Sequence, residues 1–172
     1  MNATAALLTK DGLPLPETVA QLAQHLSQRG WMMATGESCT GGLIAGACSE
    51  RPGSSQWLDC GFVTYSNRAK SAMLDVSAAL IAAHGAVSEP VARAMAEGAI
   101  AQSQAQVSVA VTGVAGPDGG SASKPVGTVW FGWQVAGQLH SEVQRFDGDR
   151  HAVRQATVRH ALRRLLELVQ AA

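Results

Sequence analysis

The stretch that most constrains the fold lies between residues 31 and 48, where two apolar runs flank a polar loop. The apolar run Trp31–Met33 leads into the loop Ala34–Gly42, and the small and apolar residues of Leu43–Cys48 follow. This order predicts a strand, a tight loop and a helix. The first N–H groups of such a helix have no intrahelical partner, so they can bind an anion or a developing oxyanion. Ser38 lies close to the predicted helix start, although Ser38 or Thr40 there can equally be an ordinary N-cap.

The composition is that of one globular domain. Of the 172 residues, 47% are hydrophobic and 15% are charged, which argues against a disordered chain. A formal net charge of zero argues against a nucleic-acid partner. Cys39, Cys48 and Cys60 show no paired spacing, so we expect no disulfide framework and no metal site, and a cytoplasmic location. The chain start lacks the features of a secretion signal, and no run approaches the ~18 apolar residues of a membrane span.

Apolar periodicity and turn residues predict strands that alternate with helices, after a loose lead-in over residues 1–15. The predicted strands cover residues 31–35, 61–66, 107–111, 128–135 and 139–146, and the predicted helices cover residues 17–29, 43–50, 77–83, 88–102 and 148–170. The short turn at 136–138 makes the last two strands an antiparallel hairpin. We therefore predict an α/β fold with three layers, α/β/α, around a mixed, mostly parallel sheet.

Three candidate site residues, Ser38, Tyr65 and Thr112, each lie at or just beyond the carboxyl end of a predicted strand. In open α/β sheets ligands bind at that edge, so we expect the three side chains to line one cleft. A serine hydroxyl needs a base to take its proton. Lys70 is the best candidate, because a lysine desolvated in a pocket can lose its proton near neutral pH. The alternative is that Lys70 is an ordinary surface lysine.

Ser38 is followed directly by Cys39, and a thiol is intrinsically the better nucleophile. The Gly-x-Ser-x-Gly pattern of a nucleophile elbow is incomplete, because Thr40 stands at its last position. Successive side chains at a helix start lie ~100° apart, so only one of the two can face the cleft. Cys39 precedes an apolar run and is expected to pack against the sheet, which leaves Ser38 as the candidate nucleophile.

The loop Gly113–Gly120 is rich in glycine but matches no phosphate-binding pattern. It lacks the Lys-Ser/Thr pair of a phosphate loop, and no helix clearly follows it as a dinucleotide fingerprint requires. It indicates either a close backbone approach to a ligand or a long turn.

The other basic residues indicate no further site. No histidine has an obvious partner: His84 is expected to be structural, and His25, His140 and His160 are expected to be exposed. The last predicted helix has an apolar face and a basic face. We expect Val158, Leu162, Leu165 and Val169 to be buried, and Arg154, Arg159, Arg163 and Arg164 to be solvated.

Five stretches together resemble one known family. They are Gly36–Gly42, Gly61–Asn67, His84–Pro90, Gly113–Gly120 and Lys124–Val129. The chain resembles the CinA C-terminal domain family, and most closely its stand-alone members, which are nicotinamide-nucleotide amidohydrolases. The match covers about residues 17–168 of a single domain spanning 1–172. One departure is that glycine precedes Glu37, where the family usually has alanine.

The resemblance implies a fold and an activity. The sheet would have five strands in the order 2-1-3-4-5, with strand 4 antiparallel. The reaction would hydrolyse the carboxamide of nicotinamide mononucleotide to nicotinate mononucleotide and ammonia, in pyridine nucleotide salvage and without a metal or cofactor. Family members are often homodimers, and many carry an additional N-terminal domain that 172 residues are too short to hold. The alternative is a nucleotide-binding regulatory or competence-associated module without turnover.

The resemblance also implies roles for individual residues. Its serine, tyrosine, lysine and threonine fall on Ser38, Tyr65, Lys70 and Thr112, and the arginine of its Gly-Asp-Arg stretch falls on Arg150. Ser38 would attack the amide carbon, and Lys70, helped by Tyr65, would take the proton; which of the two is the proximal base stays open. The expected substrate-binding residues are Thr40, Gly41, Gly42, Thr112, Gly113, Gly116 and Arg150, the last of which could instead be an ordinary residue at a helix start.

Overall fold

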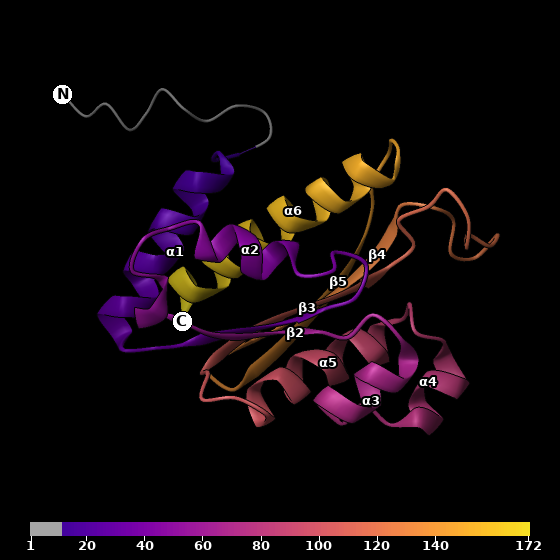
Figure 1. The fold of residues 1–172 in the computed structure, drawn as a ribbon, viewed down its shortest axis with the longest axis horizontal. Coiled ribbons are helices and arrows are strands. Elements are labelled where there is room, and N and C mark those ends of the chain that lie inside the picture. The colour runs from indigo at the N-terminus through magenta and orange to yellow at the C-terminus, as the bar shows by residue number, and fades with distance from the viewer. Residues whose placement is uncertain (1–11) are drawn as a thin grey trace.

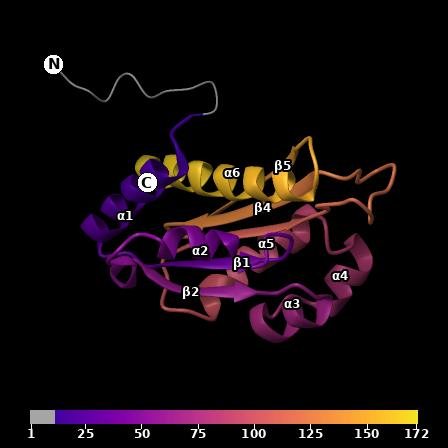
Figure 2. The ribbon, with the colours of Figure 1, turned by 45° about the horizontal axis from the view of Figure 1, so that its top comes forward.

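A computed structural model describes residues 12–172, which form a sheet between two layers of helices (Figure 1; Figure 2). The elements are α1 (Leu15–Arg29), β1 (Met33–Glu37), α2 (Leu43–Ser49), the short 3-10 turn η2 (Ser54–Gln56), β2 (Leu58–Val63), α3 (Asn67–Leu74), α4 (Ala78–His84), α5 (Glu89–Ala101), β3 (Val107–Gly113), β4 (Thr128–Val135), β5 (Gln138–Arg145) and α6 (Arg150–Ala171). The predicted three-layer α/β/α fold is therefore confirmed. Most of the expected lead-in at 1–15 lies outside the described residues, and no helix within 12–172 could cross a membrane.

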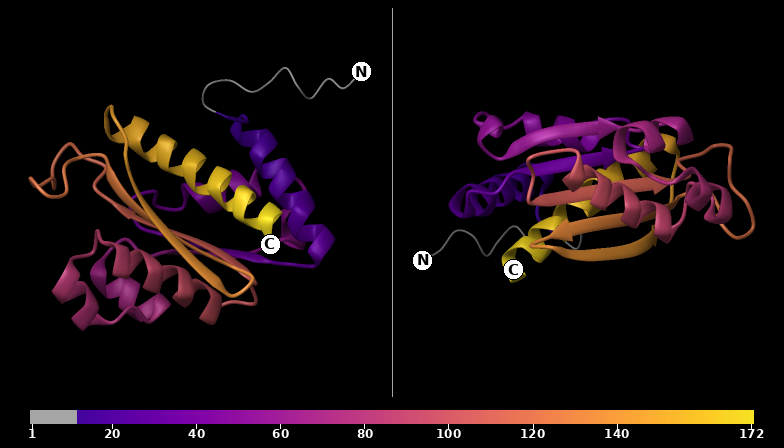
Figure 3. Two further views of the ribbon diagram at one scale, coloured as in Figure 1. Left: turned by 180° about the vertical axis from the view of Figure 1, so that it is seen from behind. Right: turned by 90° about the horizontal axis from the view of Figure 1, so that it is seen from below.

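The sheet has the order β2-β1-β3-β4-β5, as the resemblance implied. β1 pairs in parallel with β2 and β3, whereas β4 runs antiparallel to both β3 and β5 (Figure 3). Ala136 and Gly137 have φ values of 50° and 79° in the turn between β4 and β5. Two left-handed residues in a two-residue turn match the twist of an antiparallel hairpin, so the predicted hairpin is confirmed.

Different helices cover the two faces of the sheet (Figure 1). The buried cluster on one face includes side chains of α1, α2 and α6, and the cluster on the other includes side chains of α3, α4 and α5. α5 approaches β4 very closely: a Cβ atom at Gly132 would lie 2.4 Å from the carbonyl oxygen of Ala92. Glycine in the strand and alanine in the helix allow this close packing.

The two strands that lead into the predicted site are displaced from their expected positions. β1 starts at Met33 and continues to Glu37, and β2 runs over Leu58–Val63 instead of 61–66. α3 was not predicted at all. It begins after Ser66, whose Oγ accepts a hydrogen bond from the Ala69 amide at 3.0 Å. Tyr65 and Ser66 thus leave the sheet to start a helix, because an N-cap stabilises the first amides of α3.

The apolar face of α6 is buried as predicted, but its basic face is not uniformly solvated. Val158, Leu162, Leu165 and Val169 are all nearly inaccessible. The His160 side chain is only 11% exposed, and its ring lies 4.8 Å from that of Phe131 between centroids. Exposure was therefore the wrong expectation for His160, which packs between α6 and the sheet, and also for His25 and His140, which are half-buried.

Candidate active site

The predicted residues meet in a pocket of about 200 Å³ at the carboxyl ends of β1, β2 and β3. Ser38, Tyr65 and Thr112 all line it, which confirms the expected common cleft; Lys70, Gly113 and Arg150 line it as well. Thr112 lies within β3 and not beyond it. Its hydroxyl donates to the Ala86 carbonyl oxygen at 2.8 Å, which ties β3 to the segment before α5.

Lys70 is a buried residue directed at Ser38. The lysine is 1% exposed, so the surface alternative is excluded. Its Nζ lies 2.9 Å from Ser38 Oγ, 2.9 Å from the Thr64 carbonyl oxygen and 3.4 Å from that of Tyr65. Burial lowers the pKa of the Lys70 ammonium group below its ordinary value of 10.5. A neutral amine there can donate both protons to the two carbonyls and turn its lone pair to the Ser38 hydroxyl.

Cys39 packs in an apolar environment, as predicted, but it also lines the pocket together with Ser38, so the expectation that only one of the two faces the cleft was wrong. It is 6% exposed and belongs to the cluster under α1, α2 and α6. Burial is the main cause that raises the pKa of its thiol to about 11. A thiol needs its anionic form to attack, and that form is scarce at neutral pH here. The geometry therefore favours Ser38 over its neighbour.

Glu37 organises the loop that carries Ser38, a role that was not predicted from the sequence. Its carboxylate is fully buried and accepts hydrogen bonds from two hydroxyls and three backbone amides. The donors are Thr35 Oγ1 at 3.0 Å, Thr40 Oγ1 at 2.6 Å, and the amides of Gly42, Ile44 and Ala45 at 3.1, 3.0 and 2.8 Å. The protein's own carboxylate thus occupies the positive end of α2. The sequence pattern that could have indicated this role is an acidic residue a few positions before a predicted helix start.

This arrangement corrects several sequence-based expectations. The N-cap of α2 is Gly42, with φ 101° and no side-chain cap, so neither Ser38 nor Thr40 caps the helix. Thr40 is fully buried with its hydroxyl on Glu37, which removes that hydroxyl from any ligand. Gly41, Gly42 and Gly116 do not line the pocket either. The first amides of α2 are used within the protein, so they cannot bind an anion.

Two backbone amides next to Ser38 remain available. The Ser38 amide donates to Val111 O and the Gly41 amide donates to Ser38 O. Within the described residues, the amides of Cys39 and Thr40 donate to no other residue. An amide pair directly after a nucleophile is a suitable oxyanion site.

Arg154 of α6 fixes the same loop from the other side. Its guanidinium donates to the carbonyl oxygens of Cys39 at 3.1 Å and Thr40 at 3.0 Å. The expectation that Arg154 is solvated was therefore wrong, because the last helix packs across the loop and supplies donors to its carbonyls. The loop is held from both sides, by Glu37 through its N–H groups and by Arg154 through its C=O groups.

Tyr65 and Arg150 form the mouth of the pocket. Tyr65 is 59% exposed, and its hydroxyl accepts a hydrogen bond from Arg150 Nη2 at 2.9 Å. Arg150 Nη1 donates to the carbonyl oxygen of Gly116 at 2.9 Å. The side chain of Tyr65 thus hydrogen-bonds to Arg150, whereas its backbone carbonyl accepts the hydrogen bond from Lys70. Asn67, the first residue of α3, lines the pocket beside them and was missed because α3 was not predicted.

The comparisons of this chain with known proteins agree with one another. The family model described as the CinA C-terminal domain matches residues 16–169. A Pseudomonas putida protein named nicotinamide-nucleotide amidohydrolase PncC is 50% identical over 155 residues, which cover 90% of this chain and 97% of that protein. A longer Symbiobacterium thermophilum protein, named putative competence-damage inducible protein, is 50% identical over 91% of this chain and 38% of its own length. The crystal structure of a competence-damaged protein (CinA) superfamily member from Klebsiella pneumoniae superposes with a TM-score of 0.88 at 38% identity, over 92% of this chain and 99% of that one.

Proposed function

Because the chain belongs to the CinA C-terminal domain family, we propose that it is an amidohydrolase that converts nicotinamide mononucleotide and water to nicotinate mononucleotide and ammonia. The observation that carries the proposal is the hydrogen bond of 2.9 Å between Lys70 Nζ and Ser38 Oγ at a buried position. It supplies a nucleophile and its base in a chain half identical to a named nicotinamide-nucleotide amidohydrolase. The reaction returns pyridine nucleotide to salvage.

The proposed chemistry uses a serine and a lysine. Ser38 Oγ attacks the carbon of the linear carboxamide while neutral Lys70 takes the hydroxyl proton. The amides of Cys39 and Thr40 stabilise the tetrahedral oxyanion. The Lys70 ammonium then protonates the departing nitrogen. The C–N bond breaks, ammonia leaves, and a nicotinoyl ester stays on Ser38. Water, deprotonated by Lys70, attacks that ester, and the Lys70 ammonium returns the proton to Ser38 Oγ as the acid is freed.

The size of the pocket indicates how the substrate binds. A volume of about 200 Å³ suits the pyridine ring and its carboxamide better than a whole nucleotide. The ribose and phosphate then lie at the mouth, where the Arg150 guanidinium can contact the phosphate. Thr112 and Gly113 form the wall beside the ring. In this arrangement Tyr65 orients Arg150 through its hydroxyl, and Lys70 is the proximal base.

Release of ammonia from nicotinamide mononucleotide by the purified chain tests the activity. Ser38→Ala should lower the rate by several orders of magnitude, because it removes the nucleophile but little volume. Cys39→Ala is the matched control and should keep most activity. An inactive, folded Cys39→Ala beside an active Ser38→Ala would reverse the two roles. Nucleotide binding without any ammonia would instead favour the non-catalytic competence-associated module.

We also propose that the chain is a single-domain, cytoplasmic homodimer. Both helix layers pack on one sheet, which supports a single domain. Cys39, Cys48 and Cys60 are all free, which suits a reducing compartment. The dimer rests on the resemblance to the family, and light scattering coupled to size-exclusion chromatography tests it: a monomer mass at micromolar concentration would overturn it.

A further inference from the structure

The three consecutive peptide groups after Ser38 are held by hydrogen bonds to their carbonyl oxygens. These peptide bonds are trans, so the C=O of one residue and the N–H of the next point in opposite directions. A bond that fixes the oxygen therefore also fixes the direction of the N–H. The Gly41 amide donates to the Ser38 carbonyl oxygen at 3.1 Å, which fixes the N–H of Cys39.

A single guanidinium group determines the direction of both amides next to Ser38. Arg154 Nε donates to the Cys39 carbonyl oxygen at 3.1 Å, and the N–H of Thr40 is thereby directed away from Arg154. Arg154 Nη2 donates to the Thr40 carbonyl oxygen at 3.0 Å and so orients the peptide group that ends in the Gly41 N–H. That N–H is the donor that fixes the N–H of Cys39. A planar guanidinium suits this task, because its N–H groups have a fixed spacing.

Arg154 also brings a positive charge to this loop. Within the described residues it forms no ion pair. Burial raises the pKa of the Cys39 thiol to about 11, and the charge of Arg154 is one of those that oppose the rise. A positive charge on the carbonyl side of the two peptide groups also favours a negative charge on an atom that their N–H groups bind.

The helix α6 fixes the position of Arg154. Its N-cap is Asp149, whose Oδ1 accepts a hydrogen bond from the Ala152 amide at 2.8 Å. Val153 and Thr157 are fully buried beneath the same part of the helix. Arg154 therefore extends from a helix that is capped at its start and packed along its length, which limits how far the guanidinium can move from the loop.

We propose that Arg154 is a positioning residue for catalysis, because it holds the amides of Cys39 and Thr40 in the direction in which they stabilise the oxyanion. The inference rests on the proposed amidohydrolase function, since that reaction places the oxyanion beside Ser38. Arg154 is not among the described residues that line the catalytic pocket. Its loss should therefore slow the chemical step and leave substrate binding nearly unchanged, whereas loss of Arg150 at the mouth should raise KM.

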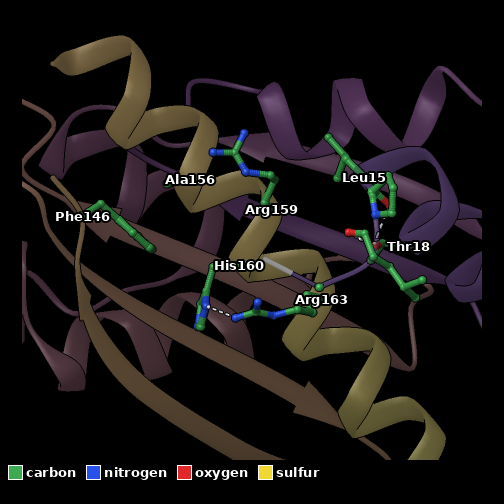
Figure 4. A pocket seen from close by; sticks show the side chains of 10 residues that line it. Leu15, Thr18, Phe146, Ala156, Arg159, His160 and Arg163 are labelled. Carbon is green, nitrogen blue, oxygen red and sulfur yellow. Dashed lines mark hydrogen bonds between the residues drawn. The ribbon is translucent and has the colours of Figure 1, made fainter. Parts of the chain in front are cut away.

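Steady-state release of ammonia from nicotinamide mononucleotide by Arg154→Ala tests the proposal. We expect kcat to fall about 100-fold, a loss typical of one missing oxyanion donor, with KM changed by less than about threefold. Guanidinium ion at millimolar concentration should restore part of kcat, because it can donate to the same carbonyls. Arg159→Ala is the matched control: the same change on the same helix, at an exposed side chain that lines a separate cavity beside α1 (Figure 4). It should keep the wild-type kcat with or without guanidinium.

Several outcomes would overturn the role of Arg154. They are a wild-type kcat in Arg154→Ala, a raised KM with unchanged kcat, and an equal loss of kcat in Arg159→Ala. A wild-type protein that releases no ammonia would instead refute the proposed function.

The positions of the amides can be tested without turnover, by NMR of the free protein. The amide signals of Cys39 and Thr40 should shift or broaden in Arg154→Ala and stay unchanged in Arg159→Ala. Unchanged signals in a folded Arg154→Ala would overturn the inference whatever the activity, so the positioning role and the amidohydrolase function can fail independently.

Discussion

Lys70 carries a pKa lowered by burial, and this one residue sets how activity depends on pH. Only the neutral amine has a lone pair for the Ser38 proton. We therefore expect kcat/KM for ammonia release to rise with pH through the lowered pKa of Lys70 and then to level off. Lys70→Met should abolish turnover and spare nucleotide binding, since it removes the base and keeps the apolar stem. A flat pH profile, or near-normal turnover in Lys70→Met, would contradict this role and leave Tyr65→Phe as the next variant to test.

The lowered pKa of Lys70 also makes the free energy of unfolding depend on pH. Between the folded pKa of Lys70 and its ordinary 10.5, the unfolded chain binds more protons than the folded chain, so the free energy of unfolding rises with pH. At pH values below the pKa of Lys70 in the folded protein, the lysine is charged in both states, and burying that charge lowers the free energy of unfolding by its full amount. Urea unfolding of the wild type and Lys70→Met should therefore show a difference that moves in favour of the wild type as pH rises. A difference independent of pH would mean that burial does not shift this lysine.

At the scale of elements, α2 depends on a carboxylate that precedes it by several residues. Glu37→Gln keeps the size of the side chain but turns an NH₂ group toward amide donors and removes the charge. We expect a loss of about 2–4 kcal/mol in the free energy of unfolding, and a lower kcat because the Ser38 loop loosens. Glu50→Gln, the same substitution at an exposed position at the other end of α2, should change neither quantity. Equal behaviour of the two variants would refute the role of Glu37.

The contact between the middle of β5 and the middle of α6 contains a second group with a shifted pKa, the carboxylate of Glu142. Burial alone would raise the pKa of Glu142, but hydrogen bonds from Gln144 and His160 and the nearby charges of His160 and Arg164 outweigh it, so the pKa lies below 4.5. A lowered carboxylate pKa gives stability that is present above the ordinary value and is lost as pH falls through the folded one. Glu142→Gln should thus destabilise the protein at neutral pH, and the difference in stability between the variant and the wild type should disappear below about pH 4. Thermal unfolding across this range measures it, and a constant gap would argue against the assignment.

At the scale of the whole molecule, local patterns predicted the element types and neighbours well. The β-rich runs and the Ala136–Gly137 turn indicated the strands and the hairpin, and the strand-end positions of Ser38, Tyr65 and Thr112 brought the site together. The strand order came from the family resemblance, because periodicity does not determine which strands pair. α3 was missed because the β-forming residues up to Ser66 were assigned to a strand, although Ser66 is itself a local N-cap signal.

Side-chain contacts made by the folded loops and helices were the least predictable, whether the partners are near or far in the chain. Glu37 looked like a loop residue because its five donors become neighbours only when the loop closes around it. Arg154 looked solvated because its partners lie more than a hundred residues earlier in the chain. His160 looked exposed because helical periodicity cannot tell that α6 lies against Phe131. In each case at least one of the partners lies outside the element that carries the residue.

The carboxylate of Glu37 at the start of α2 also bears on how the product leaves. Hydrolysis turns a neutral amide into an anion beside Ser38. The helix end there is already neutralised by Glu37, so once Lys70 has released to solvent the proton it takes from the new acid, nicotinate meets no counter-ion at the base of the pocket. Departure of the acid is then favoured without a conformational step, and inhibition by nicotinate mononucleotide should be weak. It should strengthen as pH falls and Lys70 gains a proton, so an inhibition constant that stays level from alkaline to acidic pH would show that the acid is retained by another contact.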